Sequence, residues 1–280
     1  MSFKPKKRVL EVSKHLIILL LLFVTFYPLV VMVFKSFKNV EQNMYEPFNL
    51  SFPLHLENYG VAWLYVKDSI FNSLINTAVS TVIIVILAAM GAYVFGVFEF
   101  PGKNFLYISV LALMMVPGIL TLVPLFLLSS NMGILNSKLA IILPGIRSQL
   151  PFGIFLVTAF VKGLSHEMFE AAEIDGAGMG NVFLRIVVPL VRPMLATLAI
   201  LSILFFWNDI IWPNIALMKE EEYTIAVALK PFSDANTSKT LRNYGPVMAG
   251  YVIVSIPLLV AFFFASKQFI QGMTSGAIKM

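Results

Sequence analysis

The sequence predicts an all-α membrane protein with six transmembrane helices, and composition is the first reason. The chain has 280 residues, of which 59% are hydrophobic and only 12% are charged. A soluble domain carries about a quarter charged residues, so these apolar side chains exceed what one compact core can bury. Lipid must therefore cover part of the surface. The net charge of +5 is small, and basic residues do not cluster with exposed aromatics, so no nucleic-acid partner is expected.

The second reason is the length of the apolar runs. A helix needs about 20 apolar residues to cross a bilayer core, and inside lipid each segment must satisfy its own backbone amides. Six runs are long enough to span: Leu16–Phe34, Ile70–Phe98, Asn104–Ser137, Lys138–Val161, Pro193–Ile215 and Pro246–Ser266. The third run has a predicted break near residues 129–133, where serine, asparagine and glycine gather.

Basic residues at the N-terminus orient the predicted helices. The first 15 residues hold four lysines and one arginine against a single acid, Glu11. By the positive-inside rule this end is expected to be cytoplasmic, and an even number of spans returns the C-terminus to the same side. The first apolar run is longer than that of a signal peptide, and no small-residue cleavage site follows it. We therefore expect this run to remain as a span.

Small and aromatic residues indicate helix contacts and interfacial positions. Ala88, Ala92 and Gly96 recur at every fourth position of the second run, and such small residues let two helices approach closely. Chance in an alanine-rich helix explains the spacing equally well. Trp207 and Trp212 lie near the outer end of the fifth run, where tryptophan commonly anchors a span at the membrane interface.

The stretch FEAAEIDGAG, from Phe169 to Gly178, is compact and acidic and lies between two apolar runs. Ser165 is a suitable N-cap for a helix over His166–Ile174, and Glu167 falls in the first turn, where the helix dipole favours an acid. Gly176 stands where a left-handed residue commonly ends a helix. The sequence therefore predicts a short loop helix on the cytoplasmic side.

One side of this helix would carry Met168, Ala171, Ala172 and Asp175 at helical spacing. The small alanines would let a partner surface approach the backbone, and the neighbouring glutamates would flank that contact with charge. Amphipathic loop helices are common, so periodicity alone also fits an ordinary solvated loop.

The stretch resembles the EAA loop of ABC importer permeases. The resemblance rests on Glu170-Ala171-Ala172, on Asp175-Gly176-Ala177 and on the following FLRIVVP, which ends at Pro189. FFWNDIIWP at 205–213 and the C-terminal KQFIQGMTSGAIKM are similar to the MalG-type permease of carbohydrate importers. The similarity covers nearly the whole chain and implies the type I ABC importer permease fold, with six spans.

The resemblance implies that the loop is a coupling helix, which docks on a cytoplasmic ATPase and transmits its closure to the membrane helices. The contact residues that it implies are Glu170, Ala171, Ala172, Asp175, Gly176 and Ala177. A C-terminal tail at the ATPase interface would contain Gln271, Gly272, Gly276 and Lys279. The implied partners are a second, MalF-type permease, a dimeric ATPase, an extracytoplasmic sugar-binding protein and the lipid bilayer of a bacterial cell membrane.

The residues offer no site for ATP or for catalysis. The phosphate-binding pattern GxxxxGK[ST] is absent, and its nearest trace, Gly102-Lys103, is followed by Asn104. The three histidines are scattered, no acid pair lies within one span, and the chain has no cysteine for a thiolate metal site. We therefore expect no enzyme activity, no metal and no cofactor on this chain, with ATP and Mg bound by the partner ATPase.

Polar residues within the predicted spans are candidates for the substrate path. Arg147 lies near mid-bilayer, where an ionisable residue is expected to have a function. With Gln149 it could line a sugar pathway, or it could tie helices together. Asn208 and Asp209 could bond sugar hydroxyls beside the ring of Trp207. In maltose-type systems, however, the companion permease provides most of the sugar contacts.

The expected organisation has three parts. Residues 1–69 form the N-terminal tail, the first span and an external segment; residues 70–266 form the permease core, with the coupling loop at 162–189; residues 267–280 form the cytoplasmic tail. The expected function is the permease subunit of an ATP-driven sugar importer. Alternatives are an importer of another polar solute (a polyol, glycerol phosphate or a modified oligosaccharide) and, less favoured because no repeat is visible, an ATP-independent secondary transporter.

Overall fold

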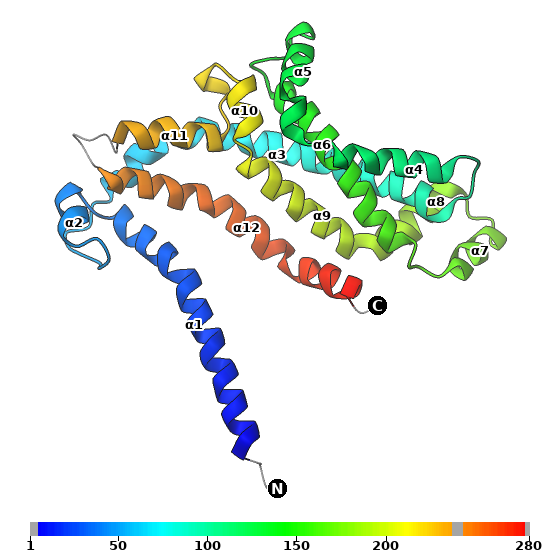
Figure 1. The fold of residues 1–280 in the computed structure, drawn as a ribbon, viewed down its shortest axis with the longest axis horizontal. Helices are drawn as coiled ribbons and strands as arrows, with labels where there is room; N and C mark the ends of the chain where they lie inside the picture. Colours follow the sequence, from blue (N-terminus) through cyan, green and yellow to red (C-terminus); the bar gives the residue numbers. More distant parts are fainter. Residues whose placement is uncertain (1–4, 237–242, 278–280) are drawn as a thin grey trace. The chain divides into compact units, whose positions relative to one another are not determined.

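The computed structural model describes the backbone of residues 5–236 and 243–277 and the side chains of residues 11–234 and 243–268. The described residues form helices and no strand, which confirms the predicted all-α class (Figure 1). In chain order the elements are α1 (Pro5–Ser36), α2 (Val40–Tyr45), α3 (Glu57–Val97), α4 (Lys103–Ala112), η1 (Leu113–Met115), α5 (Gly118–Asn131), α6 (Lys138–Val161), α7 (His166–Ile174), α8 (Met179–Val182), η2 (Phe183–Val187), α9 (Val188–Asn208), α10 (Ile211–Ala216), η3 (Glu220–Glu222), α11 (Ile225–Asn236) and α12 (Tyr244–Ala277).

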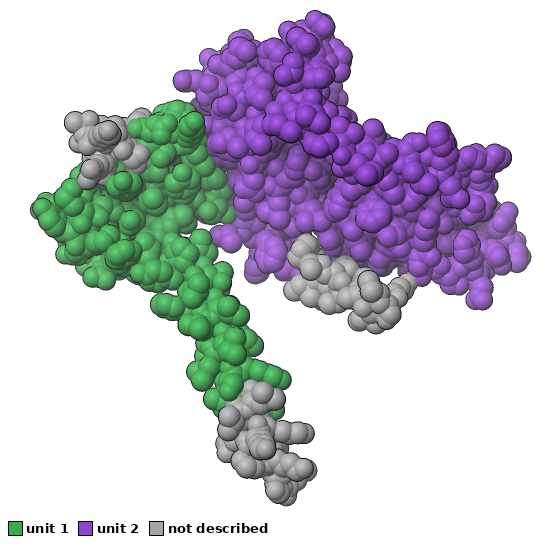
Figure 2. Space-filling view, viewed as in Figure 1, with its two compact units in different colours: residues 1–66, 229–255 green, residues 67–228, 256–280 purple. Residues whose placement is uncertain are grey.

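The chain forms two compact units, which Figure 2 shows in different colours. Unit 1 comprises residues 1–66 and 229–255, and unit 2 comprises residues 67–228 and 256–280. The two units are defined by contacts between residues, whereas the predicted division into N-terminal part, permease core and C-terminal tail is defined by the expected functions of these parts. The functional division stays a prediction.

The six predicted spans correspond to five long apolar helices and one bent pair. The five helices are Glu11–Ser36, Glu57–Val97, Lys138–Val161, Met179–Asn208 and Tyr244–Gln268. In the bent pair, Lys103–Met115 and Gly118–Asn131 meet at 90°. The predicted number of six is confirmed when this pair counts as one broken span.

The bend of the third span was not predicted. It lies at Pro117, whose backbone is extended with φ −59° and ψ 124°, and proline has no N–H to continue a helix. Val116 before it is also extended, as a residue preceding proline tends to be. The break predicted near residues 129–133 is instead the end of α5 at Asn131.

Two other predicted boundaries were wrong. The second span begins at Glu57 instead of Ile70, because Lys67 lies inside a continuous helix and does not end one. The fifth run is two helices, because the extended backbone at Asp209 separates α9 from α10.

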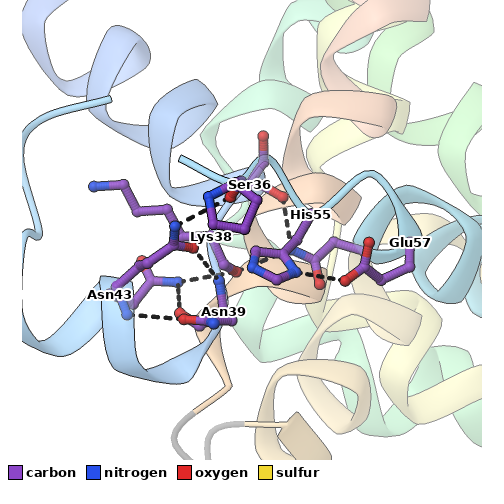
Figure 3. Close-up of polar contacts among 9 residues, drawn as sticks. Ser36, Lys38, Asn39, Asn43, His55 and Glu57 are labelled. Carbon is purple, nitrogen blue, oxygen red and sulfur yellow. Dashed lines mark hydrogen bonds and ion pairs between the residues drawn. The ribbon is translucent and has the colours of Figure 1, made fainter. Parts of the chain in front are cut away.

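Unit 1 contains a buried polar cluster at the end of α1 (Figure 3). Lys38 is fully buried, and its Nζ donates to the carbonyl oxygen of Glu46. Asn58 of α3 donates from Nδ2 to the carbonyl oxygens of Ser36 (2.9 Å) and Lys38 (3.0 Å). Burial lowers the pKa of Lys38 below its ordinary value. The cluster joins the end of α1 to the start of α3.

Unit 2 has a core in which α3, α6 and α9 pack closely. Ala88 and Ala92 of α3 are fully buried. A Cβ at Gly96 would lie 2.9 Å from the Cβ of Val161, and a Cβ at Gly153 would lie 3.0 Å from the Cβ of Ala88. The small residues predicted to mark a helix contact in the second span therefore do so.

Replacing Gly96 by alanine should destabilise the protein. The new Cβ forces Val161 to move, and overpacking of this kind costs about 1–3 kcal/mol. We expect a lower Tm of the detergent-solubilised protein. Gly60→Ala, in the same helix, is the matched control because its new Cβ meets nothing within 4 Å. Equal Tm values for the two variants would contradict the close α3–α6 contact.

Candidate coupling helix and interior cavity

The helix α7 has the bounds that the sequence predicts, with Ser165 at the N-cap position. It ends in a Schellman motif, in which two backbone N–H groups satisfy the last carbonyls. Gly176 donates to the carbonyl oxygen of Glu173 (3.0 Å), and Ala177 donates to that of Ala172 (2.9 Å). Gly176 has a φ of 72°, which confirms the predicted left-handed residue.

One face of α7 packs on the core of unit 2. Ala172 is only 8% exposed and belongs to the same cluster as Phe169 and Tyr93. The Tyr93 and Phe183 rings lie 5.5 Å apart, and the Tyr93 hydroxyl donates to the carbonyl oxygen of Met179 (3.3 Å). The side chain of Ala172 therefore faces this chain's own core, which corrects the prediction that it faces a partner.

The opposite face of α7 is exposed. It carries Glu167, Glu170, Ala171 and Ile174, and the cap residue Asp175 is exposed as well. Ile174 is 86% exposed, more than any other large hydrophobic side chain in the described part of the chain. Ile174 was not predicted as a contact residue, because the predicted contact was assigned to the small alanines. A β-branched apolar residue on the charged side of a short helix was the signal in the sequence that could have found it.

The loop between α3 and α4 lies at the same end of unit 2 as α7. Glu99 and Lys103 form an ion pair of 2.8 Å, and the Lys162 ammonium lies 4.9 Å from the centre of the Tyr107 ring. The hydrogen bond from Lys103, followed by its charge, holds the pKa of Glu99 below its ordinary value, and the charges of His166 and Lys162 add to this. These contacts place the end of α3 and the end of α6 at the same end of unit 2, as expected for spans that cross the membrane in alternating directions.

The other end of unit 2 brings together the α5–α6 turn and the segment after α10. Asn136 has a left-handed φ of 58°. Its N–H donates to the carbonyl oxygen of Ala216 (3.0 Å), and its Oδ1 accepts from the N–H of Lys219 (3.3 Å). In Figure 1, α5 and α10 lie together and away from α7.

A cavity of about 240 Å³ lies in unit 2, between α5, α6, the end of α9 and α10. Arg147 and Asp209, two of the predicted substrate-path residues, both line it. The other lining residues are Gly118, Ile119, Thr121, Leu122, Leu125, Pro144, Gly145, Ser148, Phe205, Ile211 and Trp212. Residues that lie far apart in the sequence are thus brought to one site by the packing of α6 and α9.

The other predicted path residues do not line this cavity. Gln149 is half-buried on α6, and Asn208 donates from Nδ2 to the carbonyl oxygen of Leu204 (2.8 Å). Trp207 is 4% exposed and lines a separate space of about 140 Å³ with Thr77 and Pro257. Trp207 therefore lies apart from the cavity that Arg147 and Asp209 line, and its contact with a sugar stays a prediction.

Neither tryptophan of the fifth run is an interfacial anchor, because both are buried. Trp212 is 7% exposed, and its Nε1 donates to the carbonyl oxygen of Ala140 (2.7 Å). Its ring closes one side of the cavity instead. The tail residues Gln271, Gly272 and Gly276 lie in α12, but their side chains are outside the described residues, as is Lys279 entirely.

Comparison with known proteins identifies the family. Residues 92–275 match the family model of the binding-protein-dependent transport system inner membrane component. The chain is 34% identical over 279 residues to the probable ABC transporter permease protein YurM of Bacillus subtilis, covering 99% of this chain and 92% of that protein. It is 28% identical over 267 residues to the diacetylchitobiose uptake system permease protein NgcG of Streptomyces coelicolor, covering 95% and 88%.

A solved structure has the same fold. The crystal structure of a bacterial ABC transporter involved in the import of the acidic polysaccharide alginate contains a chain with a TM-score of 0.81 at 20% identity, covering 96% of this chain and 99% of that one. The fold of an ABC importer permease is thereby confirmed. The chain belongs to the binding-protein-dependent transport system inner membrane components and is a multi-pass membrane permease subunit.

Replacing Gly176 by alanine should loosen the end of α7. An L residue in the left-handed region costs about 1–2 kcal/mol, and the added methyl meets no atom within 4 Å, so the cost is purely conformational. We expect amide hydrogen exchange in residues 166–178 to quicken by about 5–30-fold. Gly178→Ala is the control, since Gly178 has an ordinary φ of −66°. Unchanged exchange in Gly176→Ala would contradict the capping role.

Proposed function

We propose that this chain is a permease subunit of an ATP-driven sugar importer and that α7 is its coupling helix. The observation that carries the proposal is the exposed outer face of α7, with Ile174 at its C-terminal end and Glu170 one turn before it. The Ile174 side chain is 86% exposed, so a partner surface that covers it would gain the free energy of burying apolar area. A cleft in an ATPase subunit would cover Ile174 and pair with the surrounding carboxylates.

The inner face of α7 supports this role because it fixes the helix to the membrane core. Ala172 and Phe169 share one packed cluster with Tyr93 of α3 and with Phe183 of η2, which continues directly into α9. A displacement of α7 by a closing ATPase dimer would therefore move the cytoplasmic ends of the spans with it. Packed interiors respond to such a shift as rigid elements instead of deforming gradually.

The basic N-terminus supports the orientation that coupling requires. If the N-terminus is cytoplasmic, chain order places the α3–α4 loop, α7 and the C-terminus on the same side. The α5–α6 turn and α10 would then be extracytoplasmic, where a solute-binding protein would dock. A second permease would enclose the path, and ATP and Mg would be bound by the ATPase dimer.

The names of several relatives support a sugar as the solute. Besides the diacetylchitobiose permease, relatives are named for the transport of arabinooligosaccharides, trehalose and lactose. Relatives with similar sequence identity to this chain are named for different sugars. Their names therefore indicate the class of solute but not which sugar this chain transports. An importer of another polar solute remains the alternative within the same architecture.

Replacing Ile174 by aspartate or Glu170 by lysine should uncouple the complex. Loss of one central contact at an interface typically costs about 2 kcal/mol, or roughly 30-fold in affinity. We expect the ATPase to be lost when the tagged variant is purified in mild detergent, and ATP-dependent uptake to fall to background while the variant still inserts. Glu41→Lys changes an exposed acid far from α7 in sequence and serves as the control.

Two outcomes would contradict the proposal. Normal uptake by both variants, with the ATPase still bound, would show that α7 does not couple the subunits. A wild-type chain that purifies alone and moves solute into liposomes without ATP would instead make it a secondary transporter.

A further inference from the structure

The cavity between α5, α6 and α10 contains opposite charges that the fold itself does not neutralise. Arg147 and Asp209 both line it, and neither forms an ion pair with any side chain that the structure describes. The carboxylate of Asp209 accepts a hydrogen bond from the N–H of Ile211 (3.2 Å), the first residue of α10. A carboxylate accepts about four hydrogen bonds, so acceptor capacity remains.

Lipid is not a suitable neighbour for these groups. Charged side chains within spans almost always face the interior of a helix bundle or a water-filled cavity, because exposure to hydrocarbon is costly. The helix break at Pro117 lies next to this cavity, because Gly118 and Ile119 directly after the break line it. Non-helical backbone at membrane depth is tolerated where it is buried in protein or lines a cavity.

The lining matches the chemistry of a sugar ring. Arg147 offers up to five N–H donors in a planar fork, Asp209 offers acceptors, and the hydroxyls of Thr121 and Ser148 offer both. Phe205 and Trp212 supply aromatic surface for the apolar C–H face of a ring. The two charges cancel, so the site suits a neutral ligand better than a sugar acid. A cavity of about 240 Å³ is below the ~300–1,000 Å³ of drug-sized pockets and fits a single ring.

We propose that this cavity is a subsite for one neutral sugar ring on the translocation path, with Arg147 donating to and Asp209 accepting from adjacent ring hydroxyls. The inference rests on the proposed importer function and deepens it, because it gives this permease subunit its own contact with the solute. Sugar bound here would lie near the end of unit 2 that faces the binding protein in the proposed orientation.

The test uses the complete importer, purified through a tag on this chain and reconstituted with its binding protein and internal ATP. Radiolabelled diacetylchitobiose, trehalose, lactose and raffinose, for whose transport relatives of this chain are named, serve as probes. Arg147→Gln and Asp209→Asn each remove a charge while keeping a polar group, and the amide oxygen introduced by Asp209→Asn could still accept the hydrogen bond from Ile211. Losing a hydrogen bond to a charged group costs about 1.5–3 kcal/mol, so we expect the maximal uptake rate to fall about 10–100-fold.

Three readouts separate a solute contact from a structural role. The half-saturation concentration, set by the binding protein, should stay unchanged, and ATPase activity should persist. Arg192→Gln and Asp68→Asn, which remove charges outside the cavity lining, should transport normally. The chain has no cysteine, so Ser148→Cys can be labelled selectively with a soluble maleimide, and the transported sugar should slow that labelling. Asn214→Cys, exposed on α10 outside the cavity lining, should be labelled equally with and without sugar.

Wild-type kinetics in both charge variants would overturn the subsite and leave the importer function intact. Restored uptake in the charge-swapped double variant, Arg147→Asp with Asp209→Arg, would also overturn it, because the pair would then be a structural ion pair. A wild-type complex that imports a solute other than a sugar and none of the four sugars would refute the sugar assignment and the subsite together.

Discussion

The close packing of α3, α6 and α9 is the contact on which the rest of unit 2 depends. Gly96 and Ala88 of α3 meet Val161 and Gly153 of α6, and Gly145 of α6 meets the ring of Phe206 on α9. In lipid no hydrophobic effect drives helices together, so association relies on van der Waals contact that only small residues allow. This contact fixes the ends of the helices against which α7 packs. It also fixes the opposite parts of α6 and α9, which line the cavity.

The two candidate sites differ in how they use that framework. The coupling helix α7 is rigid on one face, through Ala172 and the Schellman motif, and exposed on the other, where Ile174 and Glu170 have no cover within the described chain. The cavity lies between several helices, and Arg147, Ser148 and Asp209 line it. One site is therefore suited to transmitting force to a partner, and the other to holding a small ligand.

The sequence predicted local features well and three-dimensional neighbours poorly. The bounds of α7 and the left-handed Gly176 followed from capping chemistry that acts within a few residues. The bend at Pro117 could have been found from the Pro-Gly pair, a strong turn signal inside an apolar run. Ala172 and Trp207 are buried by residues that are distant in the chain. The periodicity of the sequence could therefore not predict that these side chains are buried. Arg147 and Asp209 were chosen separately as polar residues in spans; only the packing of α6 with α9 and α10 showed that they share a cavity.

The most direct test of the coupling role is a crosslink from Ile174 on the exposed face of α7. The chain has no cysteine, so Ile174→Cys provides a single reactive site for a short photoactivatable maleimide in native membranes. We expect one dominant crosslinked product, which mass spectrometry identifies as an ATP-binding subunit, and protection of the thiol from cytoplasmic reagents in the assembled complex. A thiol that reacts freely with a membrane-impermeant reagent added outside the cell, or that crosslinks only to lipid, would contradict both the coupling role and the proposed orientation.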